Sequence, residues 1–416
     1  MNDGKRAFEL LRKISFERIG GSKEEYKALK IIKDALKVEA DTTIEIEDFN
    51  VDSSNIKNVK FQVTEPNLKD YNVTAYKMCG DCDIEGEIVY LENPKLINRY
   101  ELENKIVLLD KRFSYKLYEE LVNKKVKGLV VASGAVYDKM TETDLEERFL
   151  RERHYSIACI PAVSIRINDL QTLIRSNAKK AHIIINQEQG KAVSHNLVAT
   201  ITGSKYPQEV IAFTAHYDSV RFSPGAYDNG TGAVTIFELY HYFLMHKPAR
   251  TLKFIWCGSE EMGLLGSHAY CQKHNEDLKD YRLCINIDMT GVTLGHDIAV
   301  CTSGNELVNY LDYFGKRKGE IIECSQDVYS SDSTPFAFHG VPAISFARIS
   351  PDGGADIHSR KDLIDFIDEY NLGKMVSFIA SFAEELIEAD SFPVERTMPD
   401  NMKTKLNEYL GKKAND

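Results

Sequence analysis

The sequence lacks several features that mark special classes of protein. It has no low-complexity segment and no short internal repeat, so its composition is that of a globular protein. No apolar run is long enough to span a bilayer. Residues 1–6 lead into an amphipathic pattern rather than into the apolar core of a signal peptide. We therefore expect a cytoplasmic protein, with secretion as the alternative if a signal has been removed.

An excess of basic charge is also missing. The chain has 52 Lys and Arg against 63 Asp and Glu, which gives a formal net charge of −11 at neutral pH. An acidic protein is repelled by phosphate backbones and by anionic lipid headgroups. We therefore expect neither nucleic acid nor a membrane as a partner.

The cysteines do not form a metal or redox framework. Cys79 and Cys82 have the C-x-x-C spacing of a zinc or redox pair, but a second such pair and a nearby pair of histidines are missing. Cys257, Cys284 and Cys301 lie inside apolar runs, where a small buried thiol is usual. We interpret the C-x-x-C pair as two inert thiols.

The pattern of the chain changes twice. Its 416 residues are too many for one ordinary core. Residues 5–37 have the apolar spacing of two helices, with Ser22 and Glu25 as a capping box for the second. Short β-type runs dominate from about residue 60 to 186, and strands alternate with helices from about 194 to 390. The alternation predicts an α/β fold with a mostly parallel sheet covered by helices on both faces.

Residues of metal-ligand type follow the predicted strands of the last segment. Ligands bind outside the carboxyl ends of the strands in an open α/β sheet. The residues at these ends are His216, Asp218, Asp228, Glu260, Glu261, Asp288 and His358. Each alone has an ordinary explanation, such as a helix cap or a solvated loop. Together they would bury so much negative charge that a cation is needed, and histidine with carboxylate is typical of zinc.

The order and spacing of these residues resemble the five ligand stations of the co-catalytic zinc aminopeptidases. That family also includes glutamate carboxypeptidases and glutaminyl cyclases. Residues 17–22 and 47–49 resemble its N-terminal segment, and the middle of the chain resembles an inserted, β-rich protease-associated domain. The resemblance covers nearly the whole chain. It implies that residues 1–55 are the N-terminal part of the catalytic domain, 56–190 the insert and 191–416 the rest of the catalytic domain.

The resemblance also implies roles for single residues. It implies two zinc ions, with cobalt or manganese as alternatives. The implied ligands are His216 and Asp288 for one ion, Glu261 and His358 for the other, and Asp228 as the bridge. Asp218 would orient the imidazole of His216, and Glu260 would be the general base.

Two further residues carry open interpretations. Tyr329, in a segment that resembles the family's Ser-Asp-His run, is either an oxyanion donor or a packed aromatic residue. Ser333 stands where the family commonly has histidine. Asp362 either orients the loop of His358 or caps the following helix.

These roles imply a metal-dependent exopeptidase, and we expect an aminopeptidase that acts on peptide substrates. A carboxypeptidase is one alternative. Arg221 or Arg348 would then bind the substrate carboxylate; otherwise, these arginines are ordinary ion-pair partners. A glutaminyl cyclase and a binding protein without activity are the others. The sequence leaves open whether the chain forms a homodimer.

Overall fold

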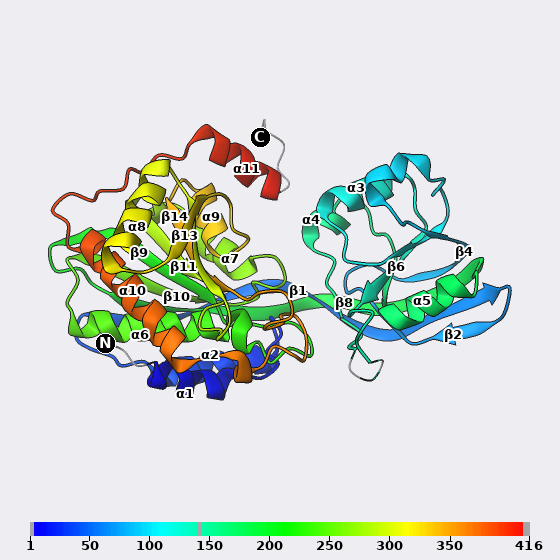
Figure 1. Cartoon of the computed structure of the whole chain (residues 1–416), viewed down its shortest axis with the longest axis horizontal. Helices are drawn as coiled ribbons and strands as arrows, with labels where there is room; N and C mark the ends of the chain where they lie inside the picture. The colour runs from blue at the N-terminus through cyan, green and yellow to red at the C-terminus, as the bar shows by residue number, and fades with distance from the viewer. Residues whose placement is uncertain (1–3, 140, 142, 411–416) are drawn as a thin grey trace. The chain divides into compact units, whose positions relative to one another are not determined.

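The computed structural model describes residues 4–139, 141 and 143–410, which form two compact units (Figure 1). The larger unit combines Met1–Val51 with Val193–Asp416, and the inserted unit is Asp52–Ala192. The two boundaries fall within the long strands β1 (Thr42–Glu65) and β8 (Lys180–Ile201). No helix among the described residues is long and apolar enough to cross a membrane.

The larger unit contains a mostly parallel sheet with the strand order β13-β12-β14-β11-β9-β10-β8. Its strands are β9 (Tyr206–His216), β10 (Arg250–Cys257), β11 (Tyr281–Ile287), β12 (His296–Thr302), β13 (Ile322–Gln326), β14 (Ala343–Ile349) and the end of β8. β14, β11, β9 and β10 run parallel in the centre, whereas β12 is antiparallel to β14 and β8 is antiparallel to β10. The carboxyl ends of the four central strands therefore meet at one edge, as the sequence predicts.

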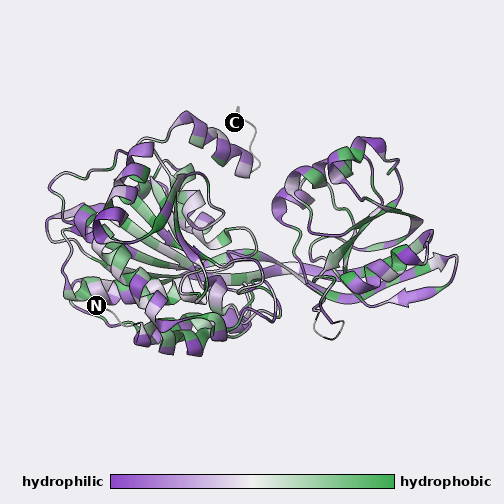
Figure 2. Ribbon diagram, in the orientation of Figure 1, coloured by the Kyte–Doolittle hydropathy of each residue, from purple (hydrophilic) through white to green (hydrophobic). Residues whose placement is uncertain are grey.

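Helices cover both faces of this sheet. One face packs against α1 (Lys5–Ile14), α2 (Lys23–Ala35), α6 (Thr231–Met245), α8 (Asn305–Lys318) and α10 (Glu369–Ile387). The other packs against α7 (Leu265–Lys273), α9 (Ser333–Phe338) and α11 (Asp400–Leu410). Strand β9 shows the alternation behind this arrangement, because Phe213 belongs to the first core and Ala212 to the second. Figure 2 shows the central strands as mostly hydrophobic and α11 as mostly hydrophilic.

The N-terminal helices follow the predicted pattern with one difference. The side chain of Ser22 accepts a hydrogen bond from the backbone N–H of Glu25 at 3.1 Å, as an N-cap should. A capping box would return the Glu25 carboxylate to Ser22. That carboxylate instead accepts from the N–H of Gly21 at 2.8 Å and from Ser194 at 2.7 Å. A local contact with Gly21 and a tertiary contact with Ser194 therefore replace half of the predicted capping box.

The inserted unit has a sheet and a hydrophobic core of its own. Its strands β4 (Cys82–Tyr90), β5 (Ile106–Leu109), β6 (Gly128–Ser133) and β7 (Ala162–Arg166) are parallel, with β3 (Val73–Ala75) antiparallel at the edge. Strand β2 (Lys69–Tyr71) pairs with β1. The helices are α3 (Tyr115–Asn123), α4 (Glu152–Tyr155) and α5 (Ile167–Arg175). Cys79 and Cys82 are both free thiols.

Candidate metal centre

The five predicted ligand residues come together at the carboxyl edge of the central strands. His216 is the last residue of β9, and Asp228 lies in the short helical turn η2 (Ala226–Gly230) before α6. The other three, Glu261, Asp288 and His358, follow β10, β11 and β14. They form two groups whose ligand atoms lie within 4.8 Å of one another: His216, Asp228 and Asp288, and Asp228, Glu261 and His358.

Asp228 is common to both groups, and its two oxygens face different histidines. Its Oδ1 is 3.2 Å from Nε2 of His216, and its Oδ2 is 3.0 Å from Nε2 of His358. Nε2 of His216 is also 3.7 Å from Oδ1 of Asp288, and Nε2 of His358 is 3.1 Å from Oε2 of Glu261. One carboxylate thus lies between two His–carboxylate clusters.

The electrostatics of the centre favour a cation. Burial alone would lower the pKa of His216, but Glu260, Asp218 and Asp228 raise it well above its usual value. The pKa of His358 is raised in the same way, against burial, by Glu261 and Asp228. The carboxylates therefore create a negative potential at both imidazoles. A divalent cation would be stabilised by the same potential.

The residues present fit a metal of the zinc class. Oδ1 of Asp288 is buried and has no hydrogen-bond partner among the described residues. A buried carboxylate oxygen left unpaired is costly, and coordination of a cation would satisfy it. Imidazole and carboxylate are common ligands of zinc.

Glu260 lies beside the two groups and belongs to neither. It is 8% exposed, and its Oε2 is 3.9 Å from Nε2 of His216. Burial, and then the neighbouring Glu261, raise its pKa well above the usual value for a carboxyl group, although His216 opposes the shift. A carboxylate in such a place has a high affinity for a proton.

The structure gives Asp218 a second contact that the sequence did not indicate. Its carboxylate accepts hydrogen bonds from the backbone N–H groups of Glu260 at 3.0 Å and Glu261 at 3.2 Å. Its Oδ1 is 3.5 Å from Nδ1 of His216. Asp218 thus lies beside the imidazole of His216 and also fixes the turn that carries both glutamates.

Asp362 and Asn229 hydrogen-bond to the backbone of the loops that carry the ligands, and the sequence did not predict these roles. The oxygens of Asp362 accept from the N–H groups of Tyr227 at 2.6 Å and Asp228 at 3.1 Å. Burial, and then the charge of Asp228, raise the pKa of Asp362 to about 7. Asp362 therefore supports the Asp228 loop, which neither of its sequence interpretations included.

Asn229 joins the Asp228 loop to the residues on both sides of Asp288. Its Nδ2 donates to the carbonyl of Ile287 at 2.9 Å, and its Oδ1 accepts from the N–H of Met289 at 3.0 Å. The position of Asn229, directly after a ligand, was the one signal available in the sequence.

Tyr329 lies near the two groups. Burial, and then the charges of Asp288 and Asp228, raise the pKa of its hydroxyl. The hydroxyl of Tyr329 is therefore within electrostatic range of both carboxylates.

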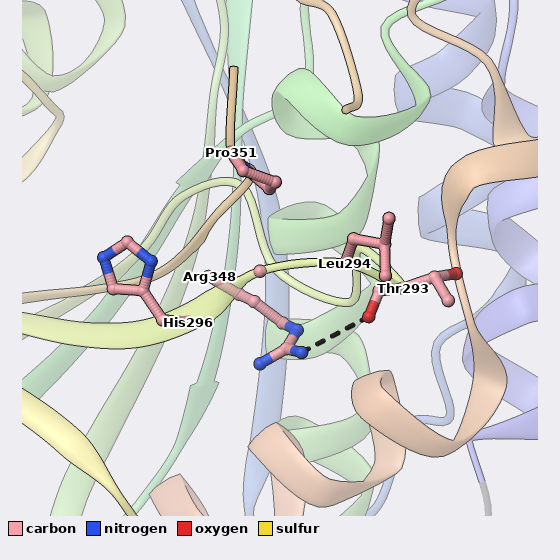
Figure 3. A pocket seen from close by; sticks show the side chains of 6 residues that line it. Thr293, Leu294, His296, Arg348 and Pro351 are labelled. Atoms are coloured by element: carbon pink, nitrogen blue, oxygen red, sulfur yellow. Dashed lines mark hydrogen bonds between the residues drawn. The ribbon is translucent and has the colours of Figure 1, made fainter. Parts of the chain in front are cut away.

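Arg348 is engaged in structural contacts. Its guanidinium donates to the carbonyl of Val292 at 2.7 Å and forms an ion pair with Asp297 at 3.0 Å. It lines a surface hollow with Thr293, Leu294, Gly295, His296 and Pro351, in which it points to the carbonyl of Thr293 (Figure 3). These contacts agree with the ion-pair interpretation of Arg348.

Comparisons with known proteins agree with this geometry. Residues 196–383 match the profile of Peptidase family M28. Bovine carboxypeptidase Q is 24% identical over 89% of this chain and 83% of its own length. Aminopeptidase YwaD of Bacillus subtilis is 28% identical over 60% of this chain. The alignment spans little more than half, 56%, of the Bacillus protein.

Solved structures share the fold. The zinc aminopeptidase BSAP from Bacillus subtilis has a TM-score of 0.73 at 20% identity, with 96% of this chain and 98% of that chain covered. An aminopeptidase from Aneurinibacillus sp. strain AM-1 has a TM-score of 0.72 at 21% identity, with 95% and 96% covered. These likenesses confirm the α/β fold with its mostly parallel sheet.

The site and the comparisons together define a class. The chain is similar over residues 196–383 to Peptidase family M28 and over most of its length to carboxypeptidase Q, in agreement with the resemblance to the co-catalytic zinc peptidases in the sequence. It is therefore a zinc metallopeptidase, a hydrolase of peptide bonds.

Proposed function

We propose that this protein is an aminopeptidase that removes N-terminal residues from peptides with two zinc ions per chain. The bridging position of Asp228 carries the proposal, because its two oxygens face two separate His–carboxylate groups. Two ions that share one carboxylate are typical of co-catalytic hydrolases. The names of two relatives, aminopeptidase YwaD and the zinc aminopeptidase BSAP, support the direction of cleavage.

The side chains of the centre have distinct roles in this proposal. His216 and Asp288 hold one zinc, and Glu261 and His358 hold the other. Bound zinc supplies a Lewis acid that lowers the pKa of water to about 7 and polarises the scissile carbonyl. Cobalt or manganese are alternative occupants, because geometry and availability decide between metals that accept the same ligands.

Glu260 accepts the proton of the attacking water and delivers it to the leaving amine. The carboxylate of Glu260 is buried and lies 3.9 Å from Nε2 of His216, which places it next to the metal centre. Asp218 holds its backbone, so that the carboxylate faces the centre. The hydroxyl of Tyr329 stabilises the oxyanion as a hydrogen-bond donor, a contribution that is typically worth about 3–4 kcal/mol.

We also propose that the inserted unit is a protease-associated domain. The unit has its own core, and its apolar parallel strands β5 and β6 are fully buried within it. None of the metal ligands identified among the described residues comes from the inserted unit.

A carboxypeptidase remains the second candidate because bovine carboxypeptidase Q aligns with most of the chain. Arg348 is a poor grip for a substrate carboxylate, because Asp297 and backbone carbonyls already occupy its guanidinium. Arg221, whose guanidinium lies 5.2 Å from the centre of the Phe222 ring, is the other arginine to test for that role, because it follows the His216 strand closely in the sequence.

The test is a substrate panel on the purified protein loaded with zinc. Aminoacyl arylamides have a free amine and report aminopeptidase activity, whereas N-blocked dipeptides with a free C-terminus report carboxypeptidase activity. We expect cleavage of the arylamides and about two zinc ions per chain by elemental analysis. Cleavage of only the N-blocked dipeptides would replace the proposal by a carboxypeptidase, and an Arg221→Ala variant would then separate the two binding modes.

A further inference from the structure

Arg18 is a fully buried cation in the segment between α1 and α2. Its guanidinium donates hydrogen bonds to backbone carbonyls from three places in the chain. Two acceptors, Ile14 at 2.9 Å and Phe16 at 3.1 Å, belong to its own segment. The others are Tyr217, Pro224 at 2.5 Å and Gly225 at 2.7 Å.

The distant acceptors belong to the loops that carry metal ligands. Tyr217 lies between His216 and Asp218, and Gly225 directly precedes the turn η2 that contains Asp228. One planar guanidinium therefore contacts both loops at once. Because its donors have a fixed fork geometry, it also fixes the distance between the acceptors.

The surrounding chain is shaped to admit this guanidinium. A Cβ atom on Gly225 would lie 2.9 Å from both Nη1 and Nη2 of Arg18. Gly225 also has a φ of +60°, which residues with side chains rarely adopt. Glycine at this position thus allows the close approach of the charge to the loop.

The charge of Arg18 faces the negative side of the metal centre. Its favourable electrostatic partners are, in decreasing order, Asp362, Asp218, Asp228 and Glu261. Burial lowers the pKa of Arg18 to about 10, so the group remains protonated at neutral pH. A buried cation without a carboxylate in direct contact is costly unless it offsets charge nearby.

We propose that Arg18 is a positioning residue of the metal centre. Through its hydrogen bonds to backbone carbonyls, it sets the spacing between the His216 loop and the Asp228 loop, and its charge offsets that of the carboxylates in these loops. The inference deepens the proposed function and rests on its metal sites. Arg18 touches neither substrate nor metal in this role. It acts through the backbone of the residues next to the ligands.

Arg250 is a matched control for the loss of a buried arginine. It is 1% exposed and donates to the carbonyls of Ile387 at 2.7 Å and Ala389 at 2.6 Å, with an ion pair to Glu209. It is the first residue of β10, at the opposite end of that strand from the glutamate turn. Its loss should cost stability without an effect on metal binding.

The experiment compares Arg18→Lys and Arg18→Met with Arg250→Lys and Arg250→Met. Zinc affinity is measured by competition with a chromophoric chelator, folding by circular dichroism, and kcat and KM with an aminoacyl arylamide. We expect zinc affinity to fall about 10–100-fold in the Arg18 variants, as for other residues that orient metal ligands. The Arg250 variants should melt at a lower temperature but bind zinc within about twofold of the parent.

Two results would overturn the proposal. One is an Arg18→Lys variant that folds and keeps the zinc affinity of the parent. The other is an Arg18→Lys variant that fails to fold in saturating zinc when Arg250→Lys folds, since Arg18 would then serve general stability. Zinc affinity is measured without substrate. If the zinc affinity of the protein depends on Arg18 but the parent cleaves no arylamide, only the proposed function is refuted.

Discussion

The adjacent glutamates of the centre give a sharp test of the chemistry, because one is outside both ligand groups and the other is inside one of them. We predict that Glu260→Gln keeps both zinc ions and loses activity, whereas Glu261→Gln loses zinc. Glutamine has the shape of glutamate, and the backbone N–H of residue 260 would still donate to Asp218. The substitution therefore removes a proton acceptor and leaves the turn in place.

The magnitude follows from the role of each carboxylate. General base catalysis contributes roughly 10²–10⁴-fold, which is about 3–5 kcal/mol of transition-state stabilisation. We expect kcat of Glu260→Gln to fall by this factor with KM nearly unchanged. In Glu261→Gln, the group of Asp228 and His358 loses its second carboxylate, while the group with His216 and Asp288 stays complete. Zinc per chain should then fall from about two to about one.

The assay combines elemental analysis after gel filtration with steady-state kinetics on an aminoacyl arylamide. A Glu260→Gln protein with full activity would refute the assignment of the base. Loss of zinc from Glu260→Gln would show that this residue is a ligand. Equal zinc content in both variants, at limiting zinc, would contradict the assignment of Glu261.

Three further changes test the supports of the site and the inserted unit. Gly20→Ala would place a Cβ atom 2.4 Å from Oγ of Ser259, next to the glutamate turn, so we expect kcat to fall about tenfold or more. The control is Gly86→Ala, whose Cβ atom would have no contact closer than 3.4 Å and should leave kcat and KM unchanged. Asp362→Asn should weaken zinc binding about 10–100-fold in a chelator competition, because one of two backbone donors loses its acceptor; unchanged affinity would contradict this role. Burial lowers the pKa of His154 to about 4, so the unfolded state binds more protons between pH 4 and 6.5 and stability should fall as pH falls through that window. Calorimetry should show that His154→Phe removes on the order of 2 kcal/mol of the change in unfolding free energy of the inserted unit between these pH values. If the unfolding free energy of the variant depends on pH as that of the parent does, the lowered pKa of His154 is refuted.

The ligands could be predicted from the sequence because the rule that connects them is local. Each of His216, Asp288 and the glutamate pair follows a recognisable apolar strand, and the parallel arrangement of those strands brings their carboxyl ends together. His358 was the least local, since a loop separates it from the end of β14. It was still predicted from its place in the loop after that apolar strand, and only its role as a zinc ligand depended on the resemblance to a family.

The residues behind the ligands could not be predicted in the same way. Arg18 contacts carbonyls about 200 positions away, and Asp362 contacts backbone N–H groups more than 130 positions away. A side chain that binds a distant backbone imposes no spacing on the sequence, because any residue type can supply a carbonyl or an N–H group. Glu25 shows the same difficulty, since its local pattern predicted a capping box and its carboxylate also accepts from the N–H of Ser259 at 3.0 Å.

The supporting carboxylates have a consequence for stability. Asp218, Asp362 and Glu25 are all buried, and each accepts hydrogen bonds from backbone N–H groups. They lie behind ligands that are themselves mostly carboxylates. Burial raises the pKa of Glu25 to about 8 and that of Asp362 to about 7, so negative charge on these groups is unfavourable, and Arg18 offsets it only in part. Without a cation, this charge should oppose folding.

Metal binding and folding should therefore be coupled. An ion at about a thousand times its dissociation constant stabilises the native state by about 4 kcal/mol. We expect a chelator to lower the melting temperature by several degrees in the larger unit, with restoration by zinc. The variant His358→Ala, which leaves the His216 group whole, should show a smaller dependence on zinc. A melting temperature that is the same with and without chelator would mean that the buried carboxylates are neutralised by protons instead, and that the centre is folded before the metal arrives.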